Sequence, residues 1–94
     1  MVKKIIKMGA QWCGPCKAFS KTFENVSKMD EYKDIEFKEL DIDEDDATDM
    51  VEKFQVRSVP TIVLLNDNDE LVSKVIGNVK ESDFIKIIND AMAQ

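Results

Sequence analysis

The chain has 94 residues, 44% of them hydrophobic, and a formal net charge of -6. This length suffices for one domain with its own core, so we expect a single domain over residues 1–94. Nucleic acid is disfavoured as a partner, because phosphate binding needs clustered Lys and Arg, and the 13 basic residues are outnumbered by 19 acidic ones. No apolar run is long enough for a signal peptide or a membrane span, so we expect a cytoplasmic protein.

The first half of the chain predicts a strand, a helix and a second strand. Residues 2–8 are rich in β-branched side chains, which favours a strand, and residues 9–12 predict a connection. From Pro15 to about Met29, apolar residues recur every three or four positions, as on the buried face of a helix. Residues 35–42 predict the second strand, parallel to the first because a helix joins the two. The expected buried helix positions are Cys16, Phe19, Phe23, Val26 and Met29.

The second half predicts a short helix, a hairpin and a final helix. An acidic run over residues 41–46 precedes the short helix near residues 47–54, whose start it would stabilise. Residues 58–65 predict an apolar strand, and residues 70–76 a return strand that pairs with it as an antiparallel hairpin. The last helix begins near Lys80. The expected fold is α/β, in the order βαβαββα, with a four-stranded mixed central sheet and flanking helices.

Both cysteines lie in one C-x-x-C motif, Cys13 and Cys16, where the first strand gives way to the first helix. Two thiols three positions apart can close a small disulfide ring, and a helix start stabilises a thiolate. Pro15 fits this place, because proline is tolerated at the first helical position. We expect Cys13 to be the exposed thiol, with a pKa lowered from about 8.5 toward roughly 7, and Cys16 to be the shielded one.

Three other interpretations of the cysteine pair are weaker. A zinc site needs four ligands, whereas the chain has two cysteines and no histidine, so we expect no bound metal. A structural disulfide across so short a loop would remove little entropy from the unfolded chain. Chance occurrence of the motif is disfavoured by the strand before it and the helix after it, a context that favours redox chemistry.

The segment from Trp12 to Lys17, W-C-G-P-C-K, resembles the active-site motif of the thioredoxin family. The segment 56–61 resembles the part of that family which carries a cis-proline, here Pro60, and Gly77 resembles the glycine that lines the substrate groove. The three elements agree in order, and the match covers nearly the whole chain. The resemblance implies a thioredoxin-like fold, shortened because the usual first strand and helix are absent.

The resemblance also implies a thiol-disulfide oxidoreductase that acts on disulfide-containing proteins as a reductase and electron carrier. Cys13 would attack the substrate disulfide, and Cys16 would resolve the mixed disulfide that forms. The Gly-Pro pair between the cysteines is similar to that of thioredoxin itself, which implies a reductant. We expect a monomer with no bound cofactor, whose Cys13–Cys16 disulfide receives electrons from a thioredoxin-reductase-like enzyme. The residues implied in substrate binding are Trp12, Gly14, Pro15, Val59, Pro60 and Gly77.

Two other functions stay open on the sequence alone. The short length favours a glutaredoxin-like protein reduced by glutathione, whereas Trp12 and the Gly-Pro pair do not. A redox-inert binding module would use an apolar surface around Trp12 and Val59, and its thiols would be incidental. At single positions the alternative is ordinary structure, with Trp12 a packed aromatic, Pro60 an edge-strand residue and Gly77 a turn.

Two charges reverse the pattern of the resembled family. Lys7 lies six residues before Cys13, where thioredoxins typically carry a buried aspartate, and Glu39 falls where they typically carry a lysine. Strand alternation turns both side chains inward, and we expect them to be buried as a pair, because burial of one charge alone is costly. The hypothesis is that Glu39 accepts the proton of Cys16 while Lys7 holds the carboxylate in place. The alternative is that both side chains reach the surface past the strand ends.

Overall fold

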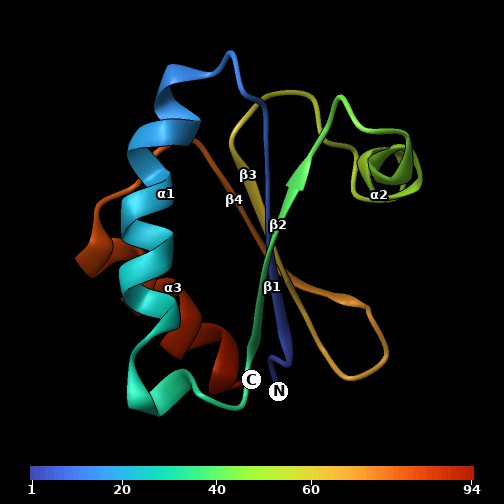
Figure 1. The fold of residues 1–94 in the computed structure, drawn as a ribbon. Coiled ribbons are helices and arrows are strands. Elements are labelled where there is room, and N and C mark those ends of the chain that lie inside the picture. The colour runs from blue at the N-terminus through green and yellow to red at the C-terminus, as the bar shows by residue number, and fades with distance from the viewer.

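The computed structural model describes all residues, 1–94, and shows four strands and three α-helices (Figure 1). Their order is the predicted βαβαββα, and two short 3₁₀ helices, η1 and η2, lie before β2 and α2. The elements are β1 (Lys4–Gly9), α1 (Gly14–Ser27), η1 (Asp30–Tyr32), β2 (Glu36–Asp41), η2 (Asp45–Ala47), α2 (Thr48–Lys53), β3 (Thr61–Leu65), β4 (Leu71–Ile76) and α3 (Glu81–Met92).

The strands form one mixed sheet in the order β2-β1-β3-β4. As predicted, β1 and β2 are parallel, because α1 connects them, and β3 and β4 form an antiparallel hairpin. The strand β1 also pairs antiparallel with β3. The strand β2 is therefore an edge strand that pairs only with β1, whereas β3 lies inside the sheet with a neighbour on each side.

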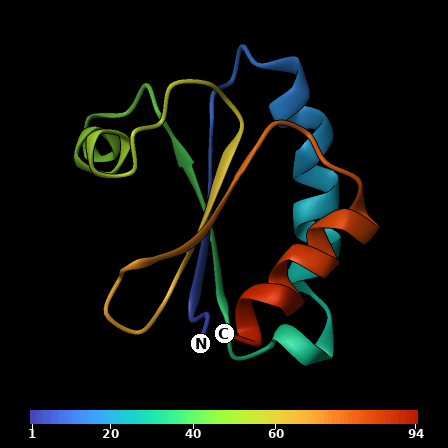
Figure 2. The same cartoon turned by 180° about the vertical axis from the view of Figure 1, so that it is seen from behind.

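Helices cover both faces of the sheet: α1 and α3 lie on one face and α2 on the other (Figures 1 and 2). The alternation of side chains along β1 divides the core accordingly. Ile5 belongs to the larger cluster under α1 and α3, whereas Ile6 and Met8 pack with Phe54 on the α2 face. None of the helices is both long enough and apolar enough to span a membrane.

Some predicted boundaries are wrong, for local reasons. Gly9 belongs to β1 and not to the connection, because its carbonyl accepts a hydrogen bond from Ile42 N–H at 2.9 Å, which extends the pairing of β1 with β2. The helix α1 ends at Ser27, and η1 follows it and buries Tyr32, which the sequence did not predict. The strand β3 starts only at Thr61, because the preceding residues form a bend in which Thr61 Oγ1 donates to the carbonyl of residue 58.

Candidate active site around the cysteine pair

The cysteine pair lies at the junction between β1 and α1 and forms a disulfide, with the two Cα atoms 5.3 Å apart. Cys13 is the N-cap of α1 and has an extended backbone, and Cys16 N–H donates a hydrogen bond to Cys13 Sγ at 3.1 Å. Free N–H groups of a helix start, and the helix dipole, stabilise negative charge there. The sulfur of Cys13 is therefore placed to become a thiolate on reduction. Pro15 is the second helical residue and not the first, because the helix begins at Gly14.

The expectation that Cys13 is exposed is wrong for this disulfide form. Cys13 is 4% exposed and Cys16 is 2% exposed, and both pack with Ala10 and Val59. Cys13 is covered because its sulfur is bonded to Cys16 and lies 3.7 Å from the carbonyl oxygen of Val59. The two sulfurs are thus distinguished by their neighbours: Cys13 faces the Val59 loop, and Cys16 faces Gly9.

The loop before β3 faces the disulfide. Its Val59–Pro60 peptide bond is cis, as the resemblance implied, and Pro60 is not an edge-strand residue, because it precedes the internal strand β3. Gly77 follows β4, has a φ of +94°, and donates its N–H to the carbonyl of Pro60 at 2.9 Å. Glycine adopts such a positive φ without steric cost. Gly77 therefore lies against the Val59–Pro60 segment, and Val59 faces Cys13.

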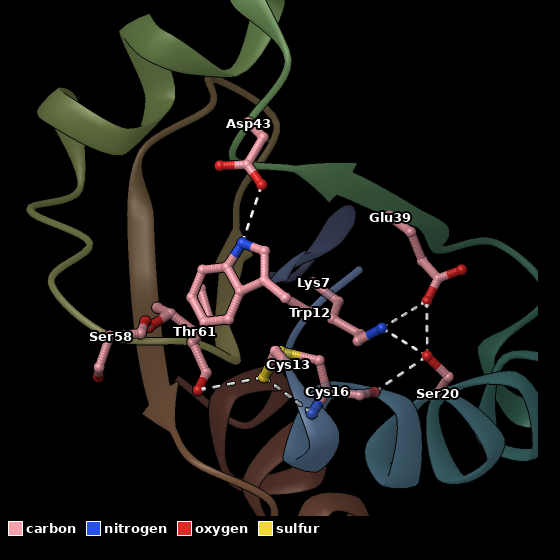
Figure 3. The surroundings of a disulfide bond; sticks show 10 residues. Lys7, Trp12, Cys13, Cys16, Ser20, Glu39, Asp43, Ser58 and Thr61 are labelled. Atoms are coloured by element: carbon pink, nitrogen blue, oxygen red, sulfur yellow. Dashed lines mark hydrogen bonds and ion pairs between the residues drawn. A yellow bond between two sulfur atoms is a disulfide. The ribbon is translucent and has the colours of Figure 1, made fainter. Parts of the chain in front are cut away.

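Trp12 is not a packed aromatic, because its side chain is among the most exposed of the large apolar residues, at 68%. Its indole Nε1 donates a hydrogen bond to Asp43 Oδ2 at 2.9 Å (Figure 3). The sequence did not single out Asp43. A signal was present, however: Trp12 and Asp43 follow parallel neighbours, β1 and β2, and the carboxyl ends of parallel strands meet at the same edge of a sheet.

The predicted pair of Lys7 and Glu39 is present, but only one member is buried. The two residues are neighbours across β1 and β2, and Lys7 Nζ lies 2.7 Å from Glu39 Oε1 (Figure 3). The side chain of Lys7 is 7% exposed, whereas that of Glu39 is 57% exposed. The expectation that both would be buried is wrong for Glu39, because β2 is the edge strand and its side chains reach solvent.

Ser20, which the sequence did not single out, links this ion pair to Cys16. Lys7 Nζ donates to Ser20 Oγ at 2.6 Å, and Ser20 Oγ in turn donates to the carbonyl of Cys16 at 3.0 Å. The hydroxyl also lies 3.3 Å from Glu39 Oε1. The signal was its spacing, because residues four apart lie on the same side of a helix, so Ser20 stands one turn beyond Cys16.

An open pocket of ≈ 610 Å³ lies beside Cys16 and is also lined by Lys7, Ser20 and Glu39. Gly9 forms part of its floor, and a Cβ atom there would lie 3.2 Å from Cys16 Sγ and 3.8 Å from Lys7 Cε. No group of three or more His, Cys, Asp or Glu side chains is arranged to hold a metal ion. The pocket residues are Lys7, Gly9, Ala10, Gln11, Cys16, Lys17, Ser20, Glu39, Leu40 and Asp41.

Comparisons with known proteins agree with this geometry. The protein-family model described as Thioredoxin matches residues 2–90. A thioredoxin of Aspergillus fumigatus is 37% identical over 78% of this chain, which spans 64% of that protein. A thioredoxin of Mycoplasma genitalium is 33% identical over 92% of the chain, which spans 79% of that protein. The crystal structure of the short form of thioredoxin F from spinach chloroplast superposes with a TM-score of 0.80, at 32% identity, over 97% of this chain and 78% of that one.

Three observations identify a thiol-disulfide oxidoreductase: the fold, the cysteine pair at disulfide distance, and the similarity to thioredoxins. The shared part includes the sheet, the C-x-x-C helix and the cis-proline loop, because the family match runs from residue 2 to residue 90. The chain belongs to the thioredoxin family.

Proposed function

We propose that this chain reduces disulfide bonds in other proteins, with Cys13 as the attacking thiol and Cys16 as the resolving thiol. The observation that carries the proposal is the Cys13–Cys16 disulfide at the start of α1, where Cys16 N–H donates to Cys13 Sγ. The hydrogen bond and the helix dipole stabilise the Cys13 thiolate, so Cys13 is a better nucleophile and a better leaving group than Cys16.

The proposed reaction passes two electrons and two protons from the dithiol to the substrate. The Cys13 thiolate attacks one substrate sulfur, the substrate S–S bond breaks, and the other substrate sulfur leaves as a thiolate that takes up a proton. Cys16 then loses its proton and attacks Cys13 Sγ. The bond between Cys13 and the substrate breaks, the second substrate sulfur is protonated, and the Cys13–Cys16 disulfide remains.

The substrate would lie as an extended segment against the loop of Val59 and Pro60. The backbone N–H and carbonyl of Val59 make no backbone hydrogen bond within the chain, so they are available to a peptide strand. Trp12 borders the disulfide on the surface, and Gly14 and Pro15 are exposed on the first turn of α1. Gly77, at the end of β4, lets a substrate backbone approach because it has no side chain.

We further propose that Glu39 takes up the proton that Cys16 loses in the resolving step. Both residues line the same open pocket, and the carboxylate is exposed, so it can pass the proton on to water. Glu39→Gln should slow the resolving step and leave the first attack by Cys13 little changed. Rapid mixing of the reduced protein with a fluorogenic disulfide separates the two steps, and an unchanged resolving rate would contradict this role.

The electron donor would be a thioredoxin reductase, in the cytoplasm. The deciding experiment incubates the oxidised chain with NADPH and a thioredoxin reductase, or with glutathione and its reductase, and follows the reduction of insulin disulfides. We expect the first system to support turnover. Turnover with glutathione alone would instead assign a glutaredoxin-like function.

A matched variant separates an enzyme from a binding module. Replacing both Cys13 and Cys16 with serine should abolish insulin reduction while leaving the fold intact, because the two side chains have similar volumes. A redox-inert binding module would keep its biological activity in the same variant, and that result would overturn the proposed function.

A further inference from the structure

Cys16 shares its pocket with a buried lysine, Lys7, whose side chain ends in an ammonium and not in a carboxylate. The space in front of Gly9 is shared by Cys16 Sγ and Lys7 Cε, since an added Cβ would lie 3.2 Å from the first and 3.8 Å from the second. In the same corner Lys7 donates to Ser20 Oγ, which donates to the carbonyl of Cys16 (Figure 3). Glu39 contacts both Lys7 and Ser20, but its side chain is 57% exposed to solvent.

The ammonium of Lys7 has capacity left for a further partner. An ammonium carries three N–H donors, and Lys7 Nζ uses two of them, toward Glu39 Oε1 at 2.7 Å and Ser20 Oγ at 2.6 Å. In the disulfide form, Cys16 Sγ is neutral, so no anionic sulfur is present to accept a hydrogen bond from the third N–H. On reduction, a thiolate at Cys16 would supply one in the same pocket.

The other charges that line this pocket are Lys17, Glu39 and Asp41. Lys17 and Glu39 are exposed and Asp41 is half-buried, whereas Lys7 is 6% exposed. Water and salt screen exposed charges far more than buried ones, so we expect the positive charge of Lys7 to act on Cys16 more strongly than the exposed charges do.

We infer that Lys7 is a positioning residue that stabilises the thiolate of Cys16 and thereby favours the reduced form of the cysteine pair. This inference rests on the proposed function and adds a role for Lys7 beyond holding Glu39. Reduction of the disulfide takes up two electrons and, where both sulfurs are protonated, two protons. A neighbouring cation stabilises the anionic sulfur and leaves the neutral disulfide unaffected, so it shifts the equilibrium toward the dithiol.

The test is the equilibrium of the pair with reduced and oxidised glutathione at pH 7, read by alkylation and mass spectrometry. Lys7→Met removes the cation, so the equilibrium constant for reduction should fall roughly tenfold, which is about 30 mV toward a more reducing potential. Glu39→Gln removes the partner that partly neutralises Lys7, so the equilibrium constant for reduction of this variant should rise. The rise should be smaller than the tenfold change in Lys7→Met, because Glu39 is exposed. The two variants break the same ion pair but should move the potential in opposite directions.

Two further variants serve as controls. Lys7→Arg keeps the charge and should restore a constant close to that of the parent chain, and Ser20→Ala keeps both charges and should move it less than Lys7→Met does. If Lys7→Met does not fold, Lys7→Gln replaces it. A constant that is unchanged in the neutral Lys7 variants, or that moves the same way in the Lys7 and Glu39 variants, would overturn the inference. Because glutathione equilibrates with the pair whether or not proteins are substrates, failure of insulin reduction would separately overturn the proposed function.

Discussion

Gly9 offers a test of how closely the sheet packs against the resolving cysteine. A Cβ atom at Gly9 would lie 3.2 Å from Cys16 Sγ and 3.3 Å from Cys16 Cβ, with Lys7 Cε at 3.8 Å. The first two distances are shorter than ordinary van der Waals contact, so Gly9→Ala requires Cys16 or β1 to move. Cys16 has little freedom, because it is bonded to Cys13 and lies in the first turn of α1.

The size of the effect follows from two opposing contributions. Overpacking a well-packed site costs about 1–3 kcal/mol. Replacing glycine by alanine restricts the unfolded chain, which recovers about 0.4–1 kcal/mol, and Gly9 has no positive φ that would add strain. The difference spans about 0–2.6 kcal/mol, and we expect Gly9→Ala to lower the stability of the oxidised protein by about 1.3 kcal/mol, the middle of that range. In a domain of this size, each 1 kcal/mol lowers the Tm by about 4–8 °C.

Differential scanning calorimetry of oxidised and reduced protein measures this effect, with Gly14→Ala as the matched control. A Cβ at Gly14 would have no atom within 4 Å, and Gly14 lies in a helix, so that variant should be as stable as the parent chain or more so. The loss in Gly9→Ala should be smaller in the reduced protein, because a free Cys16 sulfur can turn away. The reasoning fails if Gly9→Ala melts at or above the Tm of the parent chain while oxidised.

Three further predictions concern other residues. Burial, with a smaller contribution from a nearby carboxylate, raises the pKa of the Tyr32 phenol. The protonated phenol therefore stabilises the fold fully below about pH 10, where an unfolded tyrosine ionises, and this stabilisation is lost as the pH rises through the native pKa. Tyr32→Phe should flatten the fall of the Tm with pH above about 10, and curves of Tm against pH that run parallel for variant and parent would contradict this. Asp43→Ala removes the hydrogen-bond acceptor of Trp12, the only tryptophan of the chain. The freed indole should move more, so the anisotropy of the tryptophan fluorescence should fall while the Tm changes little. An unchanged anisotropy would show that the hydrogen bond does not restrain the indole. Cys16→Ser should trap mixed disulfides through Cys13 that mass spectrometry detects, whereas rapid release of substrate would assign resolution to another group.

Much of the fold and part of the site could be predicted from the sequence, because they depend on local pattern. Apolar residues at helical spacing defined the buried face of α1, and the alternation of strands and helices predicted the parallel pair of β1 and β2. The C-x-x-C motif, together with the strand before it, placed Cys13 at a helix start. The helix face and the place of Cys13 depend only on residues close together along the chain. The parallel pairing of β1 and β2 follows from the helix that connects them.

Exposure, in contrast, was decided by the position of each strand in the sheet. Strand alternation correctly turned Lys7 and Glu39 to the same face. It could not show that β1 is internal and β2 lies at the edge, and for that reason Lys7 is buried and Glu39 is exposed. Likewise, Cys13 is buried in the disulfide form because its sulfur is bonded to Cys16 and lies against the Val59 loop, which is far away in sequence.

The sequence by itself determined the family motif, the order of the elements and the cysteine pair, since each is encoded by residues close together along the chain. Only the tertiary structure brought Asp43 to Trp12, Ser20 to Lys7, and Gly9 against Cys16. Those contacts depend on how the ends of β1, β2 and α1 meet, and a distance across elements is set by packing and not by spacing in the chain.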